Sequence, residues 1–174
     1  MSASCVSCTS VCVKQHLPLN TNLVVPILKI PISVLVVIYK SNRDVLLIER
    51  ADRTGFWQSV TGSLDALDED LALAATREVF EETGIAVNQL PANALQNMHQ
   101  QIEYEIYPEW RFRYAPGVTR NIEHWFALQV PENTEVKLSP REHVAYEWLP
   151  YEEAAQKCFS RSNGEAILKL FSAS

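Results

Sequence analysis

Residues 62–85 read GSLDALDEDLALAATREVFEETGI and hold the pattern that decides the fold. Glu78, Glu81 and Glu82 stand at positions i, i+3 and i+4 of a predicted helix and share about 100° of one helix face. Like charges at this spacing repel each other by roughly 0.2–0.5 kcal/mol per pair. They also lie in the last turns, where the helix dipole disfavours anions. Helix stability alone therefore does not explain this segment.

The helix is predicted over residues 68–83, with Asp68 as its N-cap. Gly84 ends it, as a glycine just past a helix C-terminus does. A hard divalent cation would offset the repulsion between the carboxylates, because carboxylate oxygens suit magnesium. The ordinary alternative is an acidic helix face that is simply solvated.

Strand-like segments flank this helix on both sides. The run 33–39 is apolar and β-branched, which is typical of a central strand. Turn-forming residues at 41–44 connect it to the next strand as a hairpin. Further strands are expected over 45–50, 56–61, 98–107, 123–129 and 145–149, with a loop over 113–121, a short helix opened by Pro150 and a final helix over 163–171. This order predicts an α/β fold, with helices on the faces of a mixed sheet.

Length and composition indicate one globular domain. The chain has 174 residues, of which 47% are apolar and 21% charged, close to the average for globular proteins. Residues 1–28 are rich in Ser, Thr, Cys and Asn and show no helical period. We expect them to form a poorly ordered N-terminal extension. The domain itself is expected over residues 29–174.

The charge balance limits the partners. Fifteen Lys and Arg against 21 Asp and Glu give a net charge of −6, which disfavours unspecific binding to a nucleic-acid backbone. Small anionic metabolites fit if a cation bridges the charges. No apolar stretch is long enough for a membrane span, and the N-terminus lacks the basic region of a secretory signal. We therefore expect a cytoplasmic protein that binds neither membrane nor nucleic acid.

The four cysteines say little about function, although Cys5-x-x-Cys8 has a spacing that occurs in zinc and redox sites. Cys5, Cys8 and Cys12 crowd the N-terminus, and Cys158 stands alone near the other end. No second Cys or His pair follows Cys5 and Cys8 at the spacing of a zinc site. Reduced thiols in a reducing compartment are the expected state.

The helical segment resembles the motif of the Nudix hydrolases. That motif has Gly, five residues, Glu, seven residues, then Arg-Glu, an aliphatic residue, any residue, Glu-Glu, any residue, Gly and an aliphatic residue. The match is complete from Glu69 to Ile85, whereas six residues rather than five separate Gly62 from Glu69. The extra residue is placed in the turn 63–68, where it does not displace the helical carboxylates. It leaves open whether Asp68 or Glu69 is the first acidic residue of the motif.

Flanking segments resemble one bacterial subfamily, which hydrolyses dihydroneopterin triphosphate and also acts on dATP. These segments are residues 31–39, 56–63, 113–121 and 142–149, and the likeness spans about residues 29–170. The resemblance implies a Nudix fold, a mixed sheet sandwiched between helices. It implies magnesium-dependent hydrolysis of dihydroneopterin triphosphate to the monophosphate and pyrophosphate, in folate biosynthesis. Mn²⁺ is the expected substitute for Mg²⁺.

The resemblance also assigns roles to acidic residues. Glu78 and Glu82 are the expected metal ligands, with Glu81 beside them. Glu142 is expected to bind metal or act as general base, although without the family it reads as an ordinary surface acid. Glu69 is expected to be an outer or structural acid. Arg77 is expected to orient the glutamates through charge-assisted hydrogen bonds, with a purely structural role as the alternative.

Expected substrate contacts follow from the same resemblance. Basic and hydroxyl side chains match positions near bound substrate, and a short segment matches the lining of the base site: Lys29, Arg50, Thr61, Ser160, and Tyr104, Glu105, Ile106 and Tyr107. Solvated charge and sheet packing are the alternative readings of these residues. Trp57 and Trp125 are expected in the core or pocket wall. The histidines, His16, His99, His124 and His143, form no metal pattern and are expected to be structural.

Two other functions stay open at this point. One is a Nudix pyrophosphohydrolase for dATP or another nucleoside triphosphate, which would share the catalytic helix and differ in the base pocket. The other is a Nudix-like module that binds a nucleotide without cleaving it. Loss of a helical glutamate would favour that module, and all the helical glutamates are present.

Overall fold

One mixed sheet organises the chain. The computed structural model describes residues 28–172. The strands pair in the order β3-β2-β1-β6-β5, with β4 on β1 and β7 on β2. Among the strands of residues 28–172, only β1 and β6 pair in parallel. The strands are β1 (Ile32–Tyr39), β2 (Asp44–Arg50), β3 (Trp57–Gln58), β4 (Val60–Ser63), β5 (Leu95–Glu105), β6 (Arg120–Gln129) and β7 (His143–Pro150).

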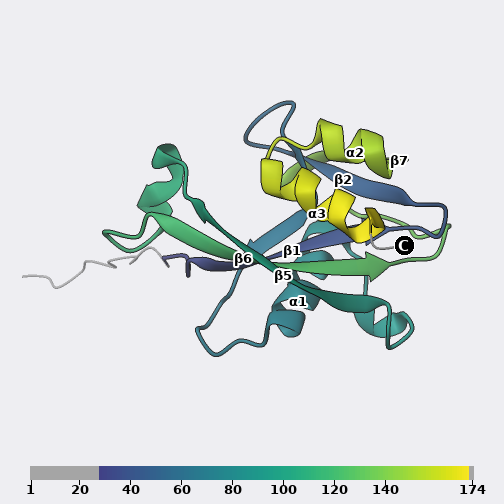
Figure 1. Ribbon diagram of the computed structural model, residues 1–174, viewed down its shortest axis with the longest axis horizontal. Coiled ribbons are helices and arrows are strands. Elements are labelled where there is room, and N and C mark those ends of the chain that lie inside the picture. Colours follow the sequence, from purple (N-terminus) through teal and green to yellow (C-terminus); the bar gives the residue numbers. More distant parts are fainter. Residues whose placement is uncertain (1–27, 173–174) are drawn as a thin grey trace, which may run out of the picture.

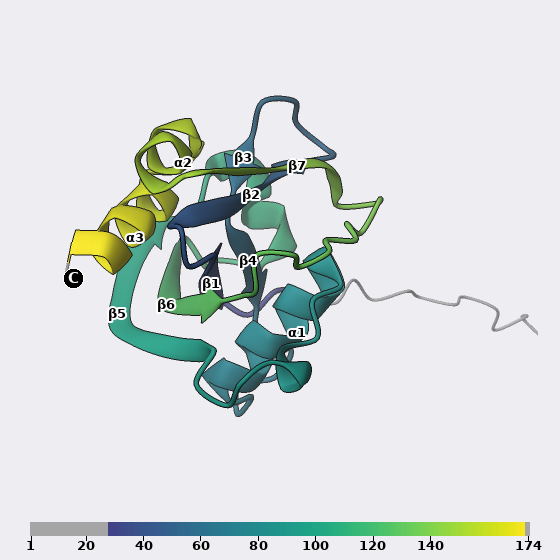
Figure 2. The same cartoon turned by 90° about the vertical axis from the view of Figure 1, so that its right-hand side faces the viewer.

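Helices cover both faces of this sheet. Helix α1 (Leu71–Thr83) packs on one face, and α2 (Tyr151–Lys157) and α3 (Arg161–Ser172) pack on the other, as both views show (Figure 1, Figure 2). Two 3₁₀ turns, η1 (Val87–Gln89) and η2 (Pro108–Arg113), complete the elements. The α/β class and the helix-covered sheet predicted from the sequence are confirmed.

The central strand β1 supplies both cores by simple alternation. Its side chains point to opposite faces in turn. Val34 and Val36 join the core under α1, whereas Leu35 and Val37 join the core under α2 and α3. Because both faces are covered, all four side chains are fully buried. This explains why the sequence of β1 is apolar throughout rather than alternating.

The N-cap of helix α1 lies two residues later than expected. Asp70, not Asp68, is the N-cap, and its Oδ1 accepts hydrogen bonds from the backbone N–H groups of Ala72 (2.9 Å) and Leu73 (3.1 Å). Gly84 ends the helix with φ of 70°, a left-handed conformation that glycine adopts without strain. The extra residue therefore lies in the turn before the helix, as expected.

The segment 56–61 was expected as one strand and is two. β3 pairs with β2, whereas β4 pairs with β1. Between them, the backbone N–H of Ser59 leaves the ladder and donates to Oδ1 of Asn163 in α3, at 2.7 Å. This break turns Thr61 and Gly62 onto the edge where α1 approaches.

Other boundaries differ less. β5 runs 95–105 rather than 98–107, and β6 begins at Arg120, inside the segment expected as a loop. The end of β5, η2 and the start of β6 form an arm that projects beyond the rest of the sheet (Figure 1). Pro150 precedes α2 as its N-cap residue. Cys5, Cys8 and Cys12 and the expected extension lie outside the described residues. Within 28–172, no helix is long and apolar enough to cross a membrane.

Asn163 ties α3 to the strand break, which generates a stability prediction. Its side chain is buried, accepts from Ser59 and donates to Oγ of Ser160 at 2.8 Å. Asn163→Ala should lower the free energy of unfolding by about 1–3 kcal/mol, because the Ser59 N–H is left buried without an acceptor. Chemical denaturation measures this loss. Asn133 is exposed, so Asn133→Ala serves as the control. Equal free energies of unfolding for the two variants would contradict the prediction.

Candidate functional site

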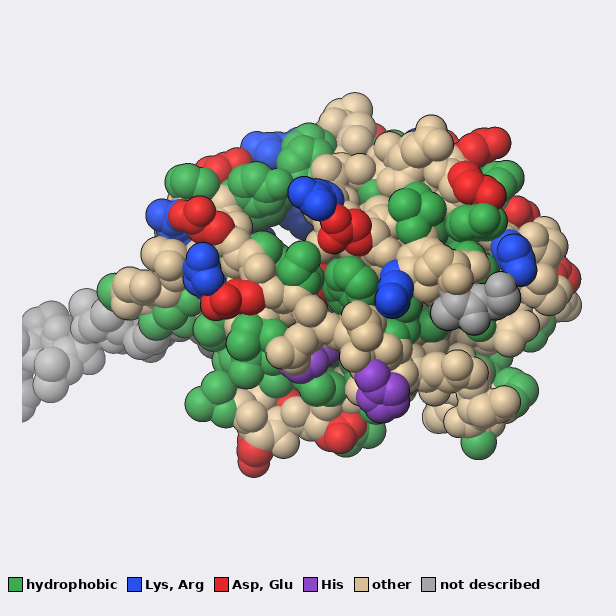
Figure 3. Space-filling model, in the orientation of Figure 1, with side chains coloured by type: hydrophobic (Ala, Val, Ile, Leu, Met, Phe, Trp, Pro, Cys, Tyr) green, Lys and Arg blue, Asp and Glu red, His purple; other side chains and the backbone are tan. Residues whose placement is uncertain are grey.

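A cavity of about 1130 Å³ opens beside α1. It is lined by α1, β4, the projecting arm, the loop before β7 and the start of α3. Figure 3 shows this face hollowed between the arm and the start of α3. The cavity brings together nearly all of the residues that the sequence nominated: Lys29, Arg50, Thr61, Gly62, Arg77, Glu78, Glu81, Glu82, Tyr104, Glu105, Ile106, Tyr107, Glu142 and Ser160.

Gly62 lets α1 approach the sheet edge closely. A Cβ atom on Gly62 would lie 1.7 Å from Cδ of Glu78, so any side chain there would displace that carboxylate. Only 12% of the Glu78 side chain is exposed. Burial raises the pKa of Glu78 to about 7, and the hydrogen bond from Arg77 opposes this only in part.

Glu82 is the most buried acid of α1. Its Oε2 accepts a hydrogen bond from the backbone N–H of Thr61 at 3.3 Å, and its Oε1 lies 3.2 Å from Nε2 of His143. Burial raises the pKa of the Glu82 carboxyl group, and the neighbouring His143 opposes the rise. Thr61 thus contributes its backbone to this wall of the cavity.

His143, which the sequence predicted to be structural, lies beside Glu82 and Glu142. Ligand atoms of Glu82, Glu142 and His143 all lie within 4.8 Å of one another, close enough to hold one metal ion. His143 is buried, and neither ring nitrogen makes a well-aligned hydrogen bond. No sequence spacing could reveal this cluster, because β7 brings His143 to α1 from far along the chain. The one local sign in the sequence that His143 lies near the site was its position next to Glu142.

Arg77 connects the acids of the motif. Its Nη1 donates to Oε1 of Glu78 at 2.6 Å, and Nε and Nη2 donate to Glu69 at 3.1 and 3.2 Å. Nη2 also donates to the backbone carbonyl of Ser63 at 3.1 Å, which anchors the guanidinium to β4. Glu81 lies 3.6 Å from Nη1, with 53% of its side chain exposed. Arg77 therefore lies where it can orient Glu78.

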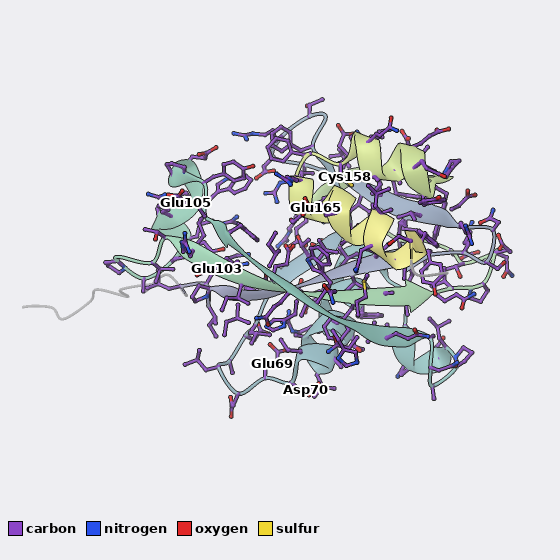
Figure 4. The ribbon with its side chains drawn as sticks, in the orientation of Figure 1. Glu69, Asp70, Glu103, Glu105, Cys158 and Glu165 are labelled. Carbon is purple, nitrogen blue, oxygen red and sulfur yellow. The ribbon has the colours of Figure 1, made fainter. Side chains whose placement is uncertain are left out.

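Glu69 lies outside the cavity wall. Its carboxylate accepts hydrogen bonds from Arg77 and from the backbone N–H of Asp65 at 2.7 Å, and the bond from Arg77 lowers its pKa. Figure 4 shows Glu69 and Asp70 beside the first turn of α1, across the sheet from Cys158 and Glu165. Glu69 thus contacts Arg77 and the turn before α1 rather than the cavity. Gly84 lies at the end of α1 and does not line the cavity.

Basic residues face the acids across the cavity. Lys29 lies beside Arg113, whose carbonyl accepts from the Lys29 backbone N–H at 2.8 Å. Although Lys29 as a residue is exposed, loss of water around its ammonium group lowers its pKa, and Arg113 acts in the same direction. Arg50 makes a bidentate pair with Asp52 at 2.7 and 2.8 Å, so part of its charge is already balanced.

The segment 104–107, which was expected to line the base site, lies partly on the floor of the cavity and partly at its mouth. Tyr104 lies on the floor, where its hydroxyl accepts from Asn121 at 3.1 Å. Ile106 is buried, Glu105 pairs with Arg111 at 2.6 Å, and Tyr107 is 41% exposed. Ser160 caps α3, since its Oγ accepts from the backbone N–H of Asn163 at 3.3 Å.

Aromatic rings gather at the mouth. Phe56 stacks on Phe159 with ring centroids 3.6 Å apart, and Tyr107 meets Trp110 edge to face at 5.2 Å. The centroids of Tyr107 and Phe159 are 6.0 Å apart, so the arm and the α2–α3 junction nearly touch. Except for Tyr107, the sequence analysis missed these rings, because they come from three separate segments.

The donor set fits a divalent cation. Glu78, Glu81, Glu82 and Glu142 offer carboxylate oxygens, which hard cations prefer. His143 adds a buried ring nitrogen, Nδ1, that has no hydrogen-bond partner among residues 28–172. Two of these acids are largely buried, where an unpaired negative charge is costly. A bound cation would remove that cost.

Burial of Glu78 predicts how stability depends on pH. Its pKa is higher in the folded chain (about 7) than the ordinary 4.5, so the folded state holds the proton more tightly. The metal-free protein should therefore lose stability as pH rises from about 5 to 8. Melting temperature measured with a chelator across this range tests the expectation.

Glu78→Gln is the matched variant. The amide does not titrate, so the variant should lose less stability than the wild type over the same pH range, and Mg²⁺ should stabilise it less at pH 8. A wild type whose melting temperature rises from pH 5 to 8 in parallel with the variant would contradict the assignment.

Comparison with known proteins agrees with this geometry. The sequence model described as the NUDIX domain matches residues 29–170. Dihydroneopterin triphosphate diphosphatase of Escherichia coli (strain K12) is 45% identical over 142 residues, which cover 80% of this chain and 91% of that protein. The Haemophilus influenzae protein of the same name is 40% identical over 138 residues, covering 79% and 85%.

A solved structure shows the same fold. The E. coli dihydroneopterin triphosphate pyrophosphohydrolase superposes with a TM-score of 0.76 at 42% identity, covering 85% of this chain and 99% of that one. The match to the NUDIX domain over residues 29–170 includes the glutamate-bearing helix α1. The chain therefore belongs to the Nudix family.

Proposed function

We propose that this chain hydrolyses dihydroneopterin triphosphate to the monophosphate and pyrophosphate, with Mg²⁺ as cofactor and Mn²⁺ as a substitute. The observation that carries the proposal is a cavity with buried glutamates at one end and room for a ring system at the other. The identity of 45% to the E. coli diphosphatase supports the choice of substrate. Bond cleavage falls between the α and β phosphates.

Glu78, Glu82, Glu81 and Glu142 would hold the metal, with His143 beside them. When bound, the cation neutralises phosphate charge and makes water a better nucleophile. Arg77 fixes Glu78 by a short hydrogen bond, and the Thr61 N–H fixes Glu82. These ligands are therefore preorganised, which is how enzymes stabilise the charge of phosphoryl transfer.

Glu142 is also proposed as the general base. It is exposed, unlike Glu78 and Glu82, and it lies beside the buried pair Glu82 and His143. Water can reach its carboxylate, which would accept a proton from the attacking water molecule. The neighbouring Glu82 keeps its own carboxylate engaged with Thr61 and His143.

Basic and hydroxyl side chains would hold the phosphates. Lys29 and Arg50 line the same cavity as the glutamates, and Thr61 and Ser160 bring hydroxyl groups to it. The Arg50 guanidinium has donors beyond those that Asp52 occupies. The segment 104–107 and the aromatic mouth would enclose the ring, since aromatic rings stack on one another favourably.

Loss of a buried metal ligand should stop turnover without unfolding the protein. Glu82→Gln keeps the size of the side chain and should lower kcat by about 10²–10³-fold. Release of pyrophosphate in the presence of Mg²⁺ measures the loss. Glu153→Gln changes an exposed acid on α2 and should leave kcat unchanged. A Glu82→Gln enzyme with wild-type turnover would refute the ligand assignment.

Substrate choice separates the proposal from the alternative that dATP or another nucleoside triphosphate is the main substrate. We expect kcat/KM to be highest for dihydroneopterin triphosphate, with dATP a weaker substrate and chelation of the metal abolishing both activities. A preference for dATP would keep the Nudix chemistry and reject the pterin. Tight binding without cleavage of any triphosphate would favour a binding module.

We also propose that residues 29–174 form the catalytic unit. The family match begins at Lys29, and every nominated site residue lies at or beyond that position. A protein that starts at residue 26 should keep the kcat/KM of the full chain. A large loss of activity would show that the preceding residues contribute to the site.

A further inference from the structure

A second buried acid lies in the cavity, away from the metal-binding glutamates. Glu123 on β6 is only 3% exposed, yet it lines the cavity. It pairs in register with Ser33 of β1, and Ser33 pairs in turn with Ser63 of β4. Adjacent strands lie about 4.8 Å apart, so Glu123 is roughly 10 Å from the Ser63 backbone. Gly62 and Glu78 adjoin that point.

The carboxylate of Glu123 has hydrogen bonds but no cation. Nε1 of Trp125 donates to Oε1 at 3.2 Å, and Ser162 of α3 supplies a second bond. None of the ion pairs within residues 28–172 includes Glu123. A carboxylate can accept about four hydrogen bonds. Two acceptor positions are therefore free for a ligand in the cavity.

The neighbouring side chains form a polar floor. Nδ2 of Asn121 donates to Oγ of Ser33 at 2.7 Å and to the Tyr104 hydroxyl at 3.1 Å. Its Oδ1 is buried and has no hydrogen-bond partner in the part of the chain that the structure describes. A buried acceptor without a donor is costly unless a ligand or water supplies one. Glu123 and Asn121 together present acceptors, and both residues line the cavity.

The geometry points to Glu123 as the residue that recognises the ring of the substrate. We propose that its carboxylate accepts two hydrogen bonds from the 2-amino-4-oxopyrimidine edge of a pterin, one from the ring N–H and one from the exocyclic amino group. Glu123 lies roughly 10 Å from the Ser63 backbone, which lies beside the metal-binding glutamates. With the ring held at Glu123, the linker and phosphates of the substrate would span this distance toward those glutamates. This inference rests on the proposed function and names its specificity determinant.

The same chemistry predicts discrimination between purines. Guanine carries an equivalent pair of N–H donors next to each other, whereas adenine presents one donor and one acceptor on the corresponding edge. An ionised carboxylate only accepts hydrogen bonds, so it would leave the adenine acceptor facing a negative charge. A site built to pair with substrate donors rejects analogues that lack them. Glu123 should therefore favour pterin and guanine rings over adenine.

Glu123→Gln is the discriminating variant. Glutamine keeps an acceptor and adds a donor, which suits adenine and mismatches the pterin. We expect kcat/KM for dihydroneopterin triphosphate and dGTP to fall by about 10–100-fold, and that for dATP to stay or rise. The matched control is Glu103→Gln. Glu103 is an exposed acid on the neighbouring strand and pairs with Arg120. In this control, kcat/KM for each of the three substrates should stay unchanged. Figure 4 shows Glu103 on the projecting arm.

A purely structural Glu123 would give a different result. If it only ties Trp125 to α3, the variant should lower kcat/KM equally for all three triphosphates and lower the melting temperature. That outcome would overturn the inference, and so would unchanged kinetics on every substrate. A shift in the ratio of pterin to dATP activity supports it.

Binding without phosphates separates this inference from the proposed function. Dihydroneopterin itself has no phosphate to cleave, and its binding can be followed by its fluorescence in the absence of metal. Wild type and Glu103→Gln should bind it equally, and Glu123→Gln at least about tenfold more weakly. Equal binding by all three proteins would reject the role of Glu123. Ring-selective binding with no triphosphate cleavage would reject the proposed activity alone.

Discussion

The close packing of α1 against the edge of β4 is the constraint on which the rest of the structure depends. Gly62 removes the side chain that would collide with Glu78, and the Thr61 N–H holds Glu82. Two carboxylates are thereby buried at the rim of a cavity, where burial raises the pKa of each. Such an arrangement is unfavourable until a cation arrives, because buried like charges destabilise each other. The helix is thus built for binding at a cost in stability.

The sheet turns that local arrangement into an elongated site. β4, β1 and β6 lie side by side, so the acidic wall and the polar floor at Glu123 are separated by the width of those strands. The arm approaches the α2–α3 junction at the cavity mouth, where the ring centroids of Tyr107 and Phe159 are 6.0 Å apart. The acidic wall and the polar floor therefore occupy different ends of one cavity. The triphosphate substrate we propose has the same division.

Residues that act through local pattern were predictable. The spacing of Glu78, Glu81 and Glu82, the guanidinium of Arg77 and the C-terminal Gly84 all belong to one helix, whose periodicity sets their relative positions. Element boundaries were less accurate. Asp70 replaced Asp68 as N-cap through local bonds to Ala72 and Leu73, and the two aspartates offer the same capping chemistry. Ser59 left the sheet to bond with Asn163, a tertiary partner that no short window of sequence contains.

The sequence by itself determined the α/β class, the acidic helix and the family to which these belong, because helical and strand periods are local and the motif lies within one segment. Only the tertiary structure decided that His143 joins Glu82 and Glu142, and that Glu123 lies on the cavity floor. Both residues sit on strands whose neighbours come from distant parts of the chain. A side chain's partners across a sheet depend on strand order and register, which the pattern of a single strand does not contain.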